Sequence, residues 1–300
     1  MRFEDFIARP ALIEHLRNTF GSGRVNHAYI FAGPEGTGKR TMARICAQAL
    51  FCQDEPGRRP CGKCAGCCQF QEGHPDVYTL TLPEKKTQIP VDSVRELLAL
   101  LSDRPFSGGM RVVLCDQAEL LNDFGQNALL KTLEEPPENT VFILCVTSVN
   151  ALLPTVVSRS QIVRFSPLDD DILEKELVKR GANSSDAENI AKYSEGSLGR
   201  ALNFINDKKL LDLAKNVEEA YKNARSGKDI ATVTTSVKAS KETAGEVLNC
   251  MEAVGRSLLK KGNEEGAFLL ESVMQARKML RSNVTWQYVL EWLYMRIADM

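Results

Sequence analysis

The stretch that decides the fold reads AYIFAGPEGTGK and runs from Ala28 to Lys39. Its apolar part, Ala28 to Ala32, stops at a glycine-rich turn, which is typical of a buried strand. A helix is expected directly after the turn, from Arg40 to Phe51. Backbone N–H groups in such a turn, together with the N-terminus of the helix, can cradle phosphate groups. The sequence therefore predicts a phosphate-binding loop with candidate contacts at Gly33, Gly36, Thr37, Gly38 and Lys39.

The rest of the first half alternates short apolar runs with amphipathic segments. Further strands are predicted at 77–80, 111–115, 141–146 and 161–165, and further helices at 92–101 and 123–134. Asp92 is expected to cap the first of these two helices. Continuous apolar strands that alternate with helices are typical of a parallel sheet covered on both faces. The fold class predicted for residues 1–166 is therefore α/β.

Every element predicted beyond Asp169 is a helix. Short helices are expected at 169–180, 184–194 and 198–206, and longer ones at 210–224, 243–261, 267–280 and 286–298. The predicted domains are a parallel α/β domain (1–166), a small helical lid (167–207) and an all-α collar (208–300). The collar helices could equally serve oligomerisation or form a self-contained bundle.

Composition narrows the classes of protein to which the chain can belong. It has 300 residues, a formal net charge of −1 and a hydrophobic share of 43%. Binding to nucleic-acid phosphates usually requires an excess of Lys and Arg, so contacts with DNA are expected to come mostly from partners. No apolar run reaches the length of a bilayer span, and the charged N-terminus is no signal peptide. We therefore expect a cytoplasmic protein without a membrane role.

The phosphate loop lacks groups that ATP hydrolysis needs. A complete loop has Ser or Thr after the lysine to bind Mg²⁺, and this chain has Arg40. Thr41 lies about 100° further around the helix, which makes it a poor substitute. Asp116 ends the strand 111–115 and suits a magnesium shell, but the next residue is Gln117, which cannot accept a proton. Weak binding of ATP or ADP without efficient hydrolysis is predicted; the alternative is a vestigial turn that binds nothing.

Four of the nine cysteines have metal-ligand spacing, in the pattern C-x8-C-x2-C-x2-C. They are Cys52, Cys61, Cys64 and Cys67. One thiolate from a helix end and three from glycine-containing turns can converge on a tetrahedral Zn²⁺ ion, and four protein ligands make such a site structural. An iron–sulfur cluster would need a cysteine downstream, where position 71 is Gln. Free buried cysteines are the other alternative, and Cys68 and His74 are possible substitute ligands.

Two strings carry a resemblance to a known family. One is HAYIFAG, from His27 to Gly33, and the other is NALLKTLEEPP, from Asn127 to Pro137. They resemble the subunits of the bacterial DNA polymerase III clamp loader, which are AAA+ proteins, and the likeness reaches to about residue 205. The resemblance implies an AAA+ domain of the P-loop type, a zinc module inserted at about 52–68, a helical lid and a collar.

Arg40 and Gln117 favour the delta-prime branch of that family, in which the nucleotide site tends to be degraded. The gamma/tau motor subunits look like intact ATPases. Gly38 and Lys39 depart from the most degraded members and keep nucleotide binding open. One alternative is an active gamma/tau-type motor, which would use Thr41 for magnesium and a water-activating group other than Gln117. The other is a stand-alone zinc-containing AAA+ protein linked to DNA.

The resemblance also implies roles for three further residues. Residues 158–160, Ser-Arg-Ser, are similar to a Ser-Arg-Cys motif whose arginine enters the ATP site of a neighbouring subunit, which would make Arg159 an arginine finger. Residues 196–200 resemble a lid motif that senses nucleotide phosphates through an arginine, here Arg200. Thr147 matches a polar sensor position. The respective alternatives are a surface arginine, a solvated lid arginine and a helix N-cap.

A hetero-oligomer follows from the same resemblance. The expected partners are gamma/tau and delta clamp-loader subunits, with the sliding clamp and primer-template DNA reached through the complex. The predicted role is a largely ATPase-inactive stator that donates Arg159 to a motor subunit, while another subunit carries out the polymerase chemistry.

Overall fold

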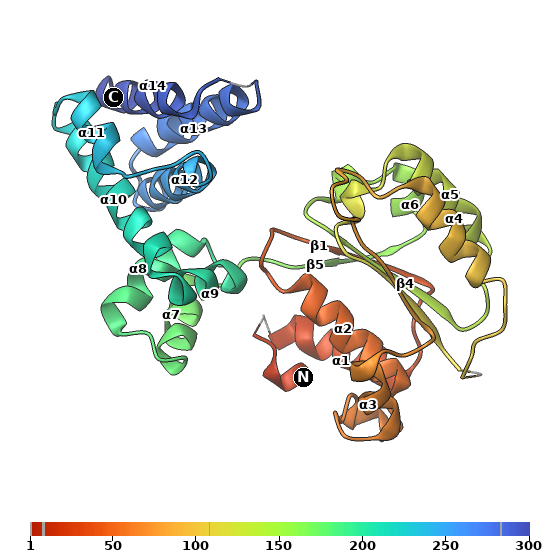
Figure 1. Ribbon diagram of the computed structural model, residues 1–300. Helices are drawn as coiled ribbons and strands as arrows, with labels where there is room; N and C mark the ends of the chain where they lie inside the picture. Colours follow the sequence, from red (N-terminus) through yellow and green to blue (C-terminus); the bar gives the residue numbers. More distant parts are fainter. Residues whose placement is uncertain (1, 8–9, 108, 283) are drawn as a thin grey trace. The chain divides into compact units, whose positions relative to one another are not determined.

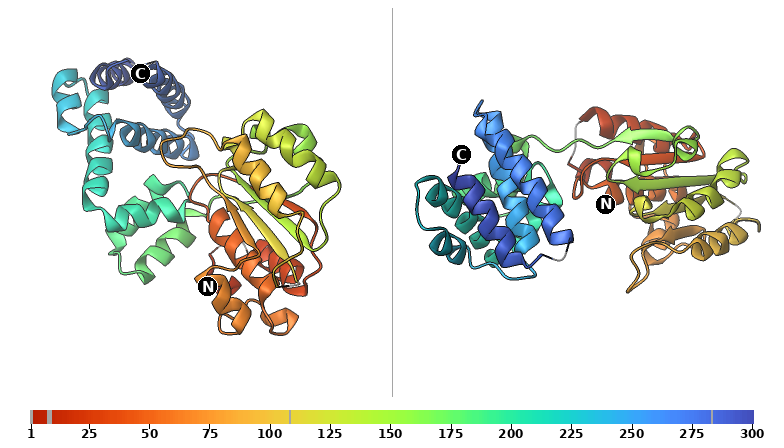
Figure 2. Two further views of the ribbon diagram at one scale, coloured as in Figure 1. Left: turned by 45° about the vertical axis from the view of Figure 1, so that its right-hand side comes forward. Right: turned by 90° about the horizontal axis from the view of Figure 1, so that it is seen from above.

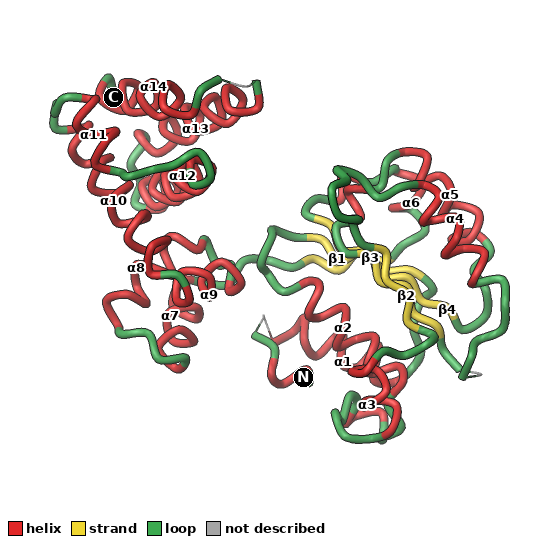
Figure 3. Tube along the Cα trace, viewed as in Figure 1, coloured by secondary structure: helices red, strands yellow, loops and turns green. Residues whose placement is uncertain are grey.

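A computed structural model describes residues 2–7, 10–107, 109–282 and 284–300 and divides the chain into two compact units (Figure 1). The first unit is Met1–Pro167 and the second is Leu168–Met300. Figure 3 shows strands only in the first unit, whereas the described part of the second is helical. The predicted α/β fold followed by helices is therefore confirmed.

The first unit is built on a five-stranded parallel sheet with the strand order β2-β3-β4-β1-β5. The strands are β1 (Ala28–Ala32), β2 (Val77–Leu80), β3 (Arg111–Cys115), β4 (Thr140–Val146) and β5 (Gln161–Arg164). β1 lies between β4 and β5, although both of these come much later in the chain. Every residue of β1, β3 and β4 is buried, because helices cover both faces of the sheet.

Helices on the two faces of the sheet create two cores in this unit (Figure 1). The helices are α1 (Pro10–Ser22), α2 (Lys39–Phe51), α3 (Ala65–Glu72), α4 (Val91–Leu100), α5 (Asp123–Glu134) and α6 (Pro154–Val157). Phe20 of α1, Met42 of α2 and Phe70 of α3 fill the core on one face. Leu97 of α4 and Leu129 of α5 belong to the core on the other face. Short 3-10 helices lie at Phe3–Asp5, Pro56–Arg58, Ala118–Leu120 and Val149–Ala151.

The start of α4 differs from the sequence prediction. Pro90 is the N-cap residue, and Asp92 lies inside the first turn, where it pairs with Arg95 at 3.1 Å. The prediction that Asp92 caps this helix is wrong, because Pro90 already fixes the extended backbone from which the helix begins. An acid in the first turn still stabilises the positive end of the helix.

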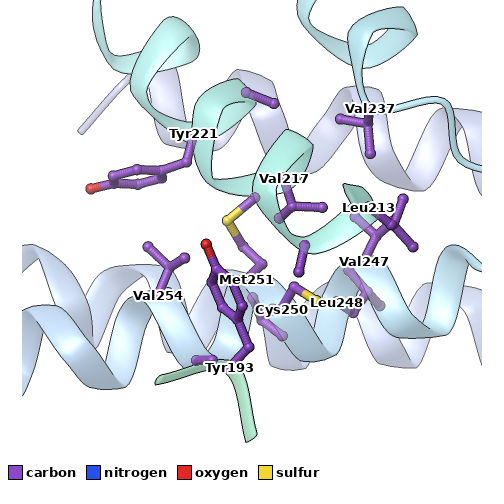
Figure 4. Packing of buried hydrophobic residues seen from close by; sticks show 14 of the residues in the cluster. Tyr193, Leu213, Val217, Tyr221, Val237, Val247, Leu248, Cys250, Met251 and Val254 are labelled. Carbon is purple, nitrogen blue, oxygen red and sulfur yellow. The ribbon is translucent and has the colours of Figure 1, made fainter. Parts of the chain in front are cut away.

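The second unit has one continuous core. Its helices are α7 (Asp170–Lys179), α8 (Ser184–Ser194), α9 (Leu198–Asn206), α10 (Lys208–Arg225), α11 (Ile230–Ser236), α12 (Ala244–Lys260), α13 (Glu265–Arg281) and α14 (Trp286–Ala298). The last three lie side by side, as the blue helices in both views of Figure 2. Figure 4 shows Tyr193 of α8, Val217 of α10 and Met251 of α12 within the core. Helices of the predicted lid and collar thus share one core, and the boundary between them near residue 207 stays a prediction.

In the described ranges of both units, no helix combines the length and the apolar character that a membrane span requires.

Candidate functional site

The residues predicted to bind nucleotide follow three neighbouring strands of the sheet. Gly33 follows β1, Thr147 follows β4 and Asp116 follows β3. These strands are paired in parallel in the order β3-β4-β1, so all three residues lie at the same edge of the sheet. The Gly33 N–H donates to the carbonyl oxygen of Val146 at 3.1 Å. Open α/β sheets bind ligands in the crevice at this carboxyl edge.

The predicted phosphate loop forms a tight turn between β1 and α2. Gly36 and Gly38 have φ values of +72° and +85°, which side chains rarely adopt, so the turn needs glycine at both positions. The Thr37 hydroxyl donates to the carbonyl oxygen of Pro34 at 2.8 Å. A Cβ atom on Gly38 would lie 2.5 Å from the ring of Phe6. The N-terminal segment therefore packs on the loop, a contact that the sequence did not predict.

Lys39 is held inside this loop. Its ammonium group is buried and donates hydrogen bonds to the carbonyl oxygens of Gly33 (2.6 Å) and Pro34 (2.8 Å). Burial lowers the pKa of Lys39, while neighbouring acidic groups, Glu119 and Asp116 among them, oppose that shift. The ammonium group is thus kept where incoming phosphate oxygens could replace the two carbonyl groups as its partners.

Arg40 contacts the acid at the end of β3. Its Nη1 atom lies 3.1 Å from Oδ2 of Asp116, with 67% of the arginine side chain and 25% of the aspartate side chain exposed. In a complete site, Mg²⁺ is held by this acid together with a hydroxyl group at position 40. The guanidinium group therefore lies at the corner of the site where magnesium would bind. Thr41, predicted to be a poor substitute for that hydroxyl group, is half-buried one residue further along α2.

An acid that the sequence analysis did not single out lies close to these residues. Gln117 is exposed with φ +61°, and Glu119 is the next acid along the chain. Oε1 of Glu119 accepts the N–H of Thr147 at 3.1 Å, and Oε2 is buried without a hydrogen-bond partner among the described residues. Glu119 therefore ties the end of β3 to the end of β4. The alternative that Thr147 is a helix cap is wrong, because Ser148 caps the following turn.

Arg159 follows the short helix α6 and is bound to its own unit. Its Nη2 donates to Oε1 of Glu134 at 2.6 Å, and its Nη1 donates to the carbonyl oxygen of Thr155 at 2.9 Å. One third of the side chain remains exposed. Glu134 is the last residue of α5 and lies in the string that carries the family resemblance, but the sequence did not indicate its ion pair with Arg159. A guanidinium group has five N–H donors, so it can still bind a further partner.

Arg200 belongs to the helical unit, where it joins α9 to α12. Its Nη2 donates to Oε1 of Glu246 at 2.6 Å, and its Nη1 lies 3.6 Å from Oε2 of Glu195. Its guanidinium carbon also lies 5.7 Å from the ring centre of Phe204. Because only 20% of the side chain is exposed, the alternative of a solvated arginine is wrong. A role in sensing nucleotide stays a prediction.

The four cysteines with metal-ligand spacing converge on one point. They are Cys52, Cys61, Cys64 and Cys67, and their sulfur atoms all lie within 4.8 Å of one another. The sulfur atoms of Cys52 and Cys64 are 3.8 Å apart. Tetrahedral Zn²⁺ with Zn–S bonds of about 2.3 Å separates its sulfur ligands by about 3.8 Å, so this donor set fits such an ion. Cys68 is exposed outside the cluster, and the imidazole of His74 accepts a backbone N–H instead.

Two helix ends hold the cysteine cluster. Cys52 is the C-cap residue of α2, Cys64 is the N-cap residue of α3, and Cys67 lies in the first turn of α3 rather than in the predicted turn. The backbone N–H groups of Gln53, Cys61 and Cys64 donate to cluster sulfur atoms at distances of 3.3 to 3.4 Å. Burial raises the pKa of the Cys64 thiol, but hydrogen bonds, first that from Gln53, bring it down to about 6. These contacts favour the thiolate form of Cys64 that metal ligation requires, whereas burial raises the pKa of Cys52 and of Cys67.

Residues 8–169 match the model of a family described as DNA polymerase III, delta subunit. The crystal structure of a gamma subunit-related protein of DNA polymerase III from Thermotoga maritima superposes with a TM-score of 0.56 and covers 95% of this chain and 98% of that chain. The two sequences are 17% identical, so this likeness concerns the fold alone.

Curated relatives include subunits of two kinds. DNA polymerase III subunit gamma of Buchnera aphidicola subsp. Schizaphis graminum is 32% identical over 220 residues, which are 71% of this chain and 60% of the relative. DNA polymerase III subunit delta' of Escherichia coli (strain K12) is 37% identical over 191 residues, which are 63% of this chain and 57% of the relative. The chain thus spans less than two thirds of the length of either relative.

Proposed function

The chain belongs to the DNA polymerase III delta subunit family of clamp-loader proteins, with an α/β AAA+ fold, and from this premise we propose that it is a delta-prime-type stator. It hydrolyses little ATP itself and supplies Arg159 in trans to the ATP site of a neighbouring motor subunit. Its partners are gamma/tau and delta subunits, with which it loads the sliding clamp onto primer-template DNA.

The Arg40–Asp116 ion pair is the observation that carries the proposal of an inactive site. Phosphoryl transfer needs a magnesium ion at this corner and a group that positions the attacking water. A guanidinium group 3.1 Å from Asp116 takes the place of the ion, and Gln117 stands where AAA+ ATPases usually have the glutamate that polarises the attacking water. Positioning and charge neutralisation make up almost all of the catalysis, so both replacements act directly on the rate.

Arg159 has the chemistry and the exposure that an arginine finger needs. Its side chain is always charged, planar and able to bind phosphate oxygens in pairs. The ion pair with Glu134 is partly exposed on both sides, 33% and 51%. Such a pair contributes about 1 kcal/mol or less, so a triphosphate in a neighbouring subunit can replace Glu134 as the partner. A finger supplied in trans accelerates hydrolysis by about 10³ to 10⁵ in related chemistry.

The cysteine cluster is assigned a structural role. Four thiolates around one Zn²⁺ ion leave no coordination position for water or substrate. The residues that would hold the ion come from the end of α2, the start of α3 and the loop between them. Bound zinc would cross-link this segment. The stator function requires no chemical reaction at the ion.

ATP turnover by a complex reconstituted from gamma/tau, delta and this chain tests the proposal. Arg159→Ala should remove the turnover of the neighbouring site while the complex still assembles, and the isolated chain should be inert. Arg164→Ala is the matched control, because it removes an exposed arginine from β5 in the same region. Full turnover with Arg159→Ala, or efficient hydrolysis by the isolated chain, would contradict the stator.

Glu119 is the observation that favours the second candidate, an active gamma/tau-type motor. Its buried Oε2 has no hydrogen-bond partner among the described residues, and it lies near enough to Lys39 to affect its pKa. It is thus a carboxylate close to the loop where Gln117 offers none. Turnover by the isolated chain that Glu119→Gln abolishes would establish the motor and exclude the stator.

A further inference from the structure

The magnesium corner of the phosphate loop contains a side-chain cation. The Arg40 guanidinium group lies 3.1 Å from the Asp116 carboxylate, and the neighbouring Lys39 ammonium group is buried in the loop. We infer that the loop binds a nucleoside di- or triphosphate in its magnesium-free form, with Arg40 in the place of the ion. This rests on the proposed function, because it takes the loop to be a nucleotide site that no longer hydrolyses.

The charges around the loop favour the free nucleotide over its magnesium complex. Arg40 neutralises Asp116, so phosphate oxygens that enter beside Lys39 do not meet an unpaired carboxylate. A magnesium ion that arrives with the nucleotide would have to displace the guanidinium group from Asp116. It would then lie beside a like charge, without the hydroxyl ligand that a Ser or Thr at position 40 provides. Binding of the magnesium complex therefore breaks the contact between Arg40 and Asp116 and adds repulsion between the ion and Arg40. Binding of the free nucleotide does neither.

Arg40 also has donors left for the phosphates. A guanidinium group carries five N–H donors in a planar fork that matches phosphate oxygens, and the contact with Asp116 is made through one nitrogen atom. Two thirds of the side chain are exposed, so the other donors can reach an incoming ligand. Arg40 lies in the first turn of α2, where the helix N-terminus attracts the same anion. One side chain can thus neutralise Asp116 and bind phosphate at the same time.

Binding of ATP and of ADP to the full chain, measured by calorimetry with EDTA and with excess magnesium, tests the inference. For the wild type, the dissociation constant in EDTA should be no higher than that in magnesium. Arg40→Ser restores a hydroxyl group and frees Asp116, so magnesium should tighten binding to this variant on the order of tenfold, a usual size for coupling between two ligands. Arg44→Ser is the matched control and should behave as the wild type. It removes the same charge from the same helix, but its guanidinium group lies over the Phe70 ring.

Several outcomes would overturn the inference. They are wild-type binding that requires magnesium, no wild-type binding in either buffer, and an equal response to magnesium in wild type and Arg40→Ser. If a thermal melt shows that Arg40→Ser is unfolded, Asp116→Asn takes its place. That variant keeps Arg40 and removes an acid, so its binding in EDTA should be at least as tight as that of the wild type, and weaker binding would count against the inference. None of these measurements involves Arg159, so turnover of the reconstituted complex reports separately on the proposed function.

Discussion

Arg159 is held by a contact with Glu134 that competes with a neighbouring triphosphate for one of its N–H donors. Its Nη2 atom donates to Oε1 of Glu134 at 2.6 Å, and the N–H group that makes this bond cannot also bind a triphosphate. Glu134→Gln keeps the shape of the side chain but removes its charge, so the arginine should be released more easily. We expect turnover of the reconstituted complex to stay unchanged or to rise by up to about fivefold, the equivalent of about 1 kcal/mol for an exposed pair. A fall comparable to that of Arg159→Ala would show instead that Glu134 positions the arginine.

Single residues also show what sequence spacing can predict about a site and what it cannot. The four cysteines could be found because their spacing within one short segment makes them converge, as the structure confirms. Glu119 and Glu134 could not, because their partners lie 28 and 25 residues away on other elements. These contacts arise only when α5 packs against α6 and β3 lies beside β4. No local pattern in the sequence indicates them.

At the scale of elements, the close packing of α3 on α2 sets the geometry of the cysteine cluster. A Cβ atom on Gly66, in the first turn of α3, would lie 2.0 Å from the carbonyl oxygen of Phe51 at the end of α2. Gly66→Ala should therefore push the two helix ends apart and weaken zinc binding on the order of tenfold. Competition with a chromogenic chelator measures this affinity.

Three control variants bracket this measurement. Gly57→Ala should leave zinc affinity unchanged, because a Cβ atom there meets nothing within 4 Å. Cys64→Ser should lose the ion, while Cys68→Ser should keep it, because Cys68 lies outside the cluster. Equal zinc affinity in Gly66→Ala and the wild type would show that the cluster does not depend on how α3 contacts α2.

Glu218 joins α10 to α8 and gives this contact a pH dependence. Its carboxylate binds the ammonium group of Lys192 at 2.8 Å and accepts a hydrogen bond from Tyr193, both on α8. Burial raises the pKa of Glu218, but Lys192, Tyr193 and Lys222 lower it to about 2. A carboxyl group whose pKa is lowered in the folded state stabilises the fold above its unfolded pKa of about 4.5, and this contribution is lost as the pH falls towards 2.

Glu218→Gln should therefore destabilise the protein in a pH-dependent way. We expect its free energy of unfolding to be about 2 kcal/mol below that of the wild type at pH 7, after allowance for partial solvent exposure. The difference should shrink between pH 4.5 and pH 3, where the wild type loses its charged contact. Urea unfolding at several pH values measures both quantities, and a difference that does not vary with pH would contradict the assignment.

Most elements could be predicted from the sequence, because long apolar runs and regular helical patterns are local signals. The helix α5 and the strand β1, for example, have the predicted bounds. The helix α11 could not be predicted, because Ile230–Ser236 consists mostly of Thr, Ile and Val, whose branched side chains favour strands. Val233 is buried in the core of the helical unit, and that burial outweighs the local preference.

At the scale of the whole molecule, each unit has the core that independent folding requires. The core of the second unit draws on all its helices from α7 to α14. A fragment of residues 168–300 should therefore be helical by circular dichroism and should unfold cooperatively. A single transition would mean that the predicted lid and collar form one cooperative unit, and two transitions would support a boundary near residue 207. A disordered fragment would show that the second unit depends on the first.

The strand order also determines when the first unit can complete its sheet during synthesis. β1 leaves the ribosome well before its neighbours in the sheet, β4 and β5, which begin at Thr140 and Gln161. At translation rates of about 5 to 20 residues per second, the apolar strand waits roughly 5 to 20 s for its first partner. In the helical unit, α12 packs on α13, which directly follows it in the chain, and such local contacts form faster. Nascent chains are thus most exposed to misassembly before β4 has emerged.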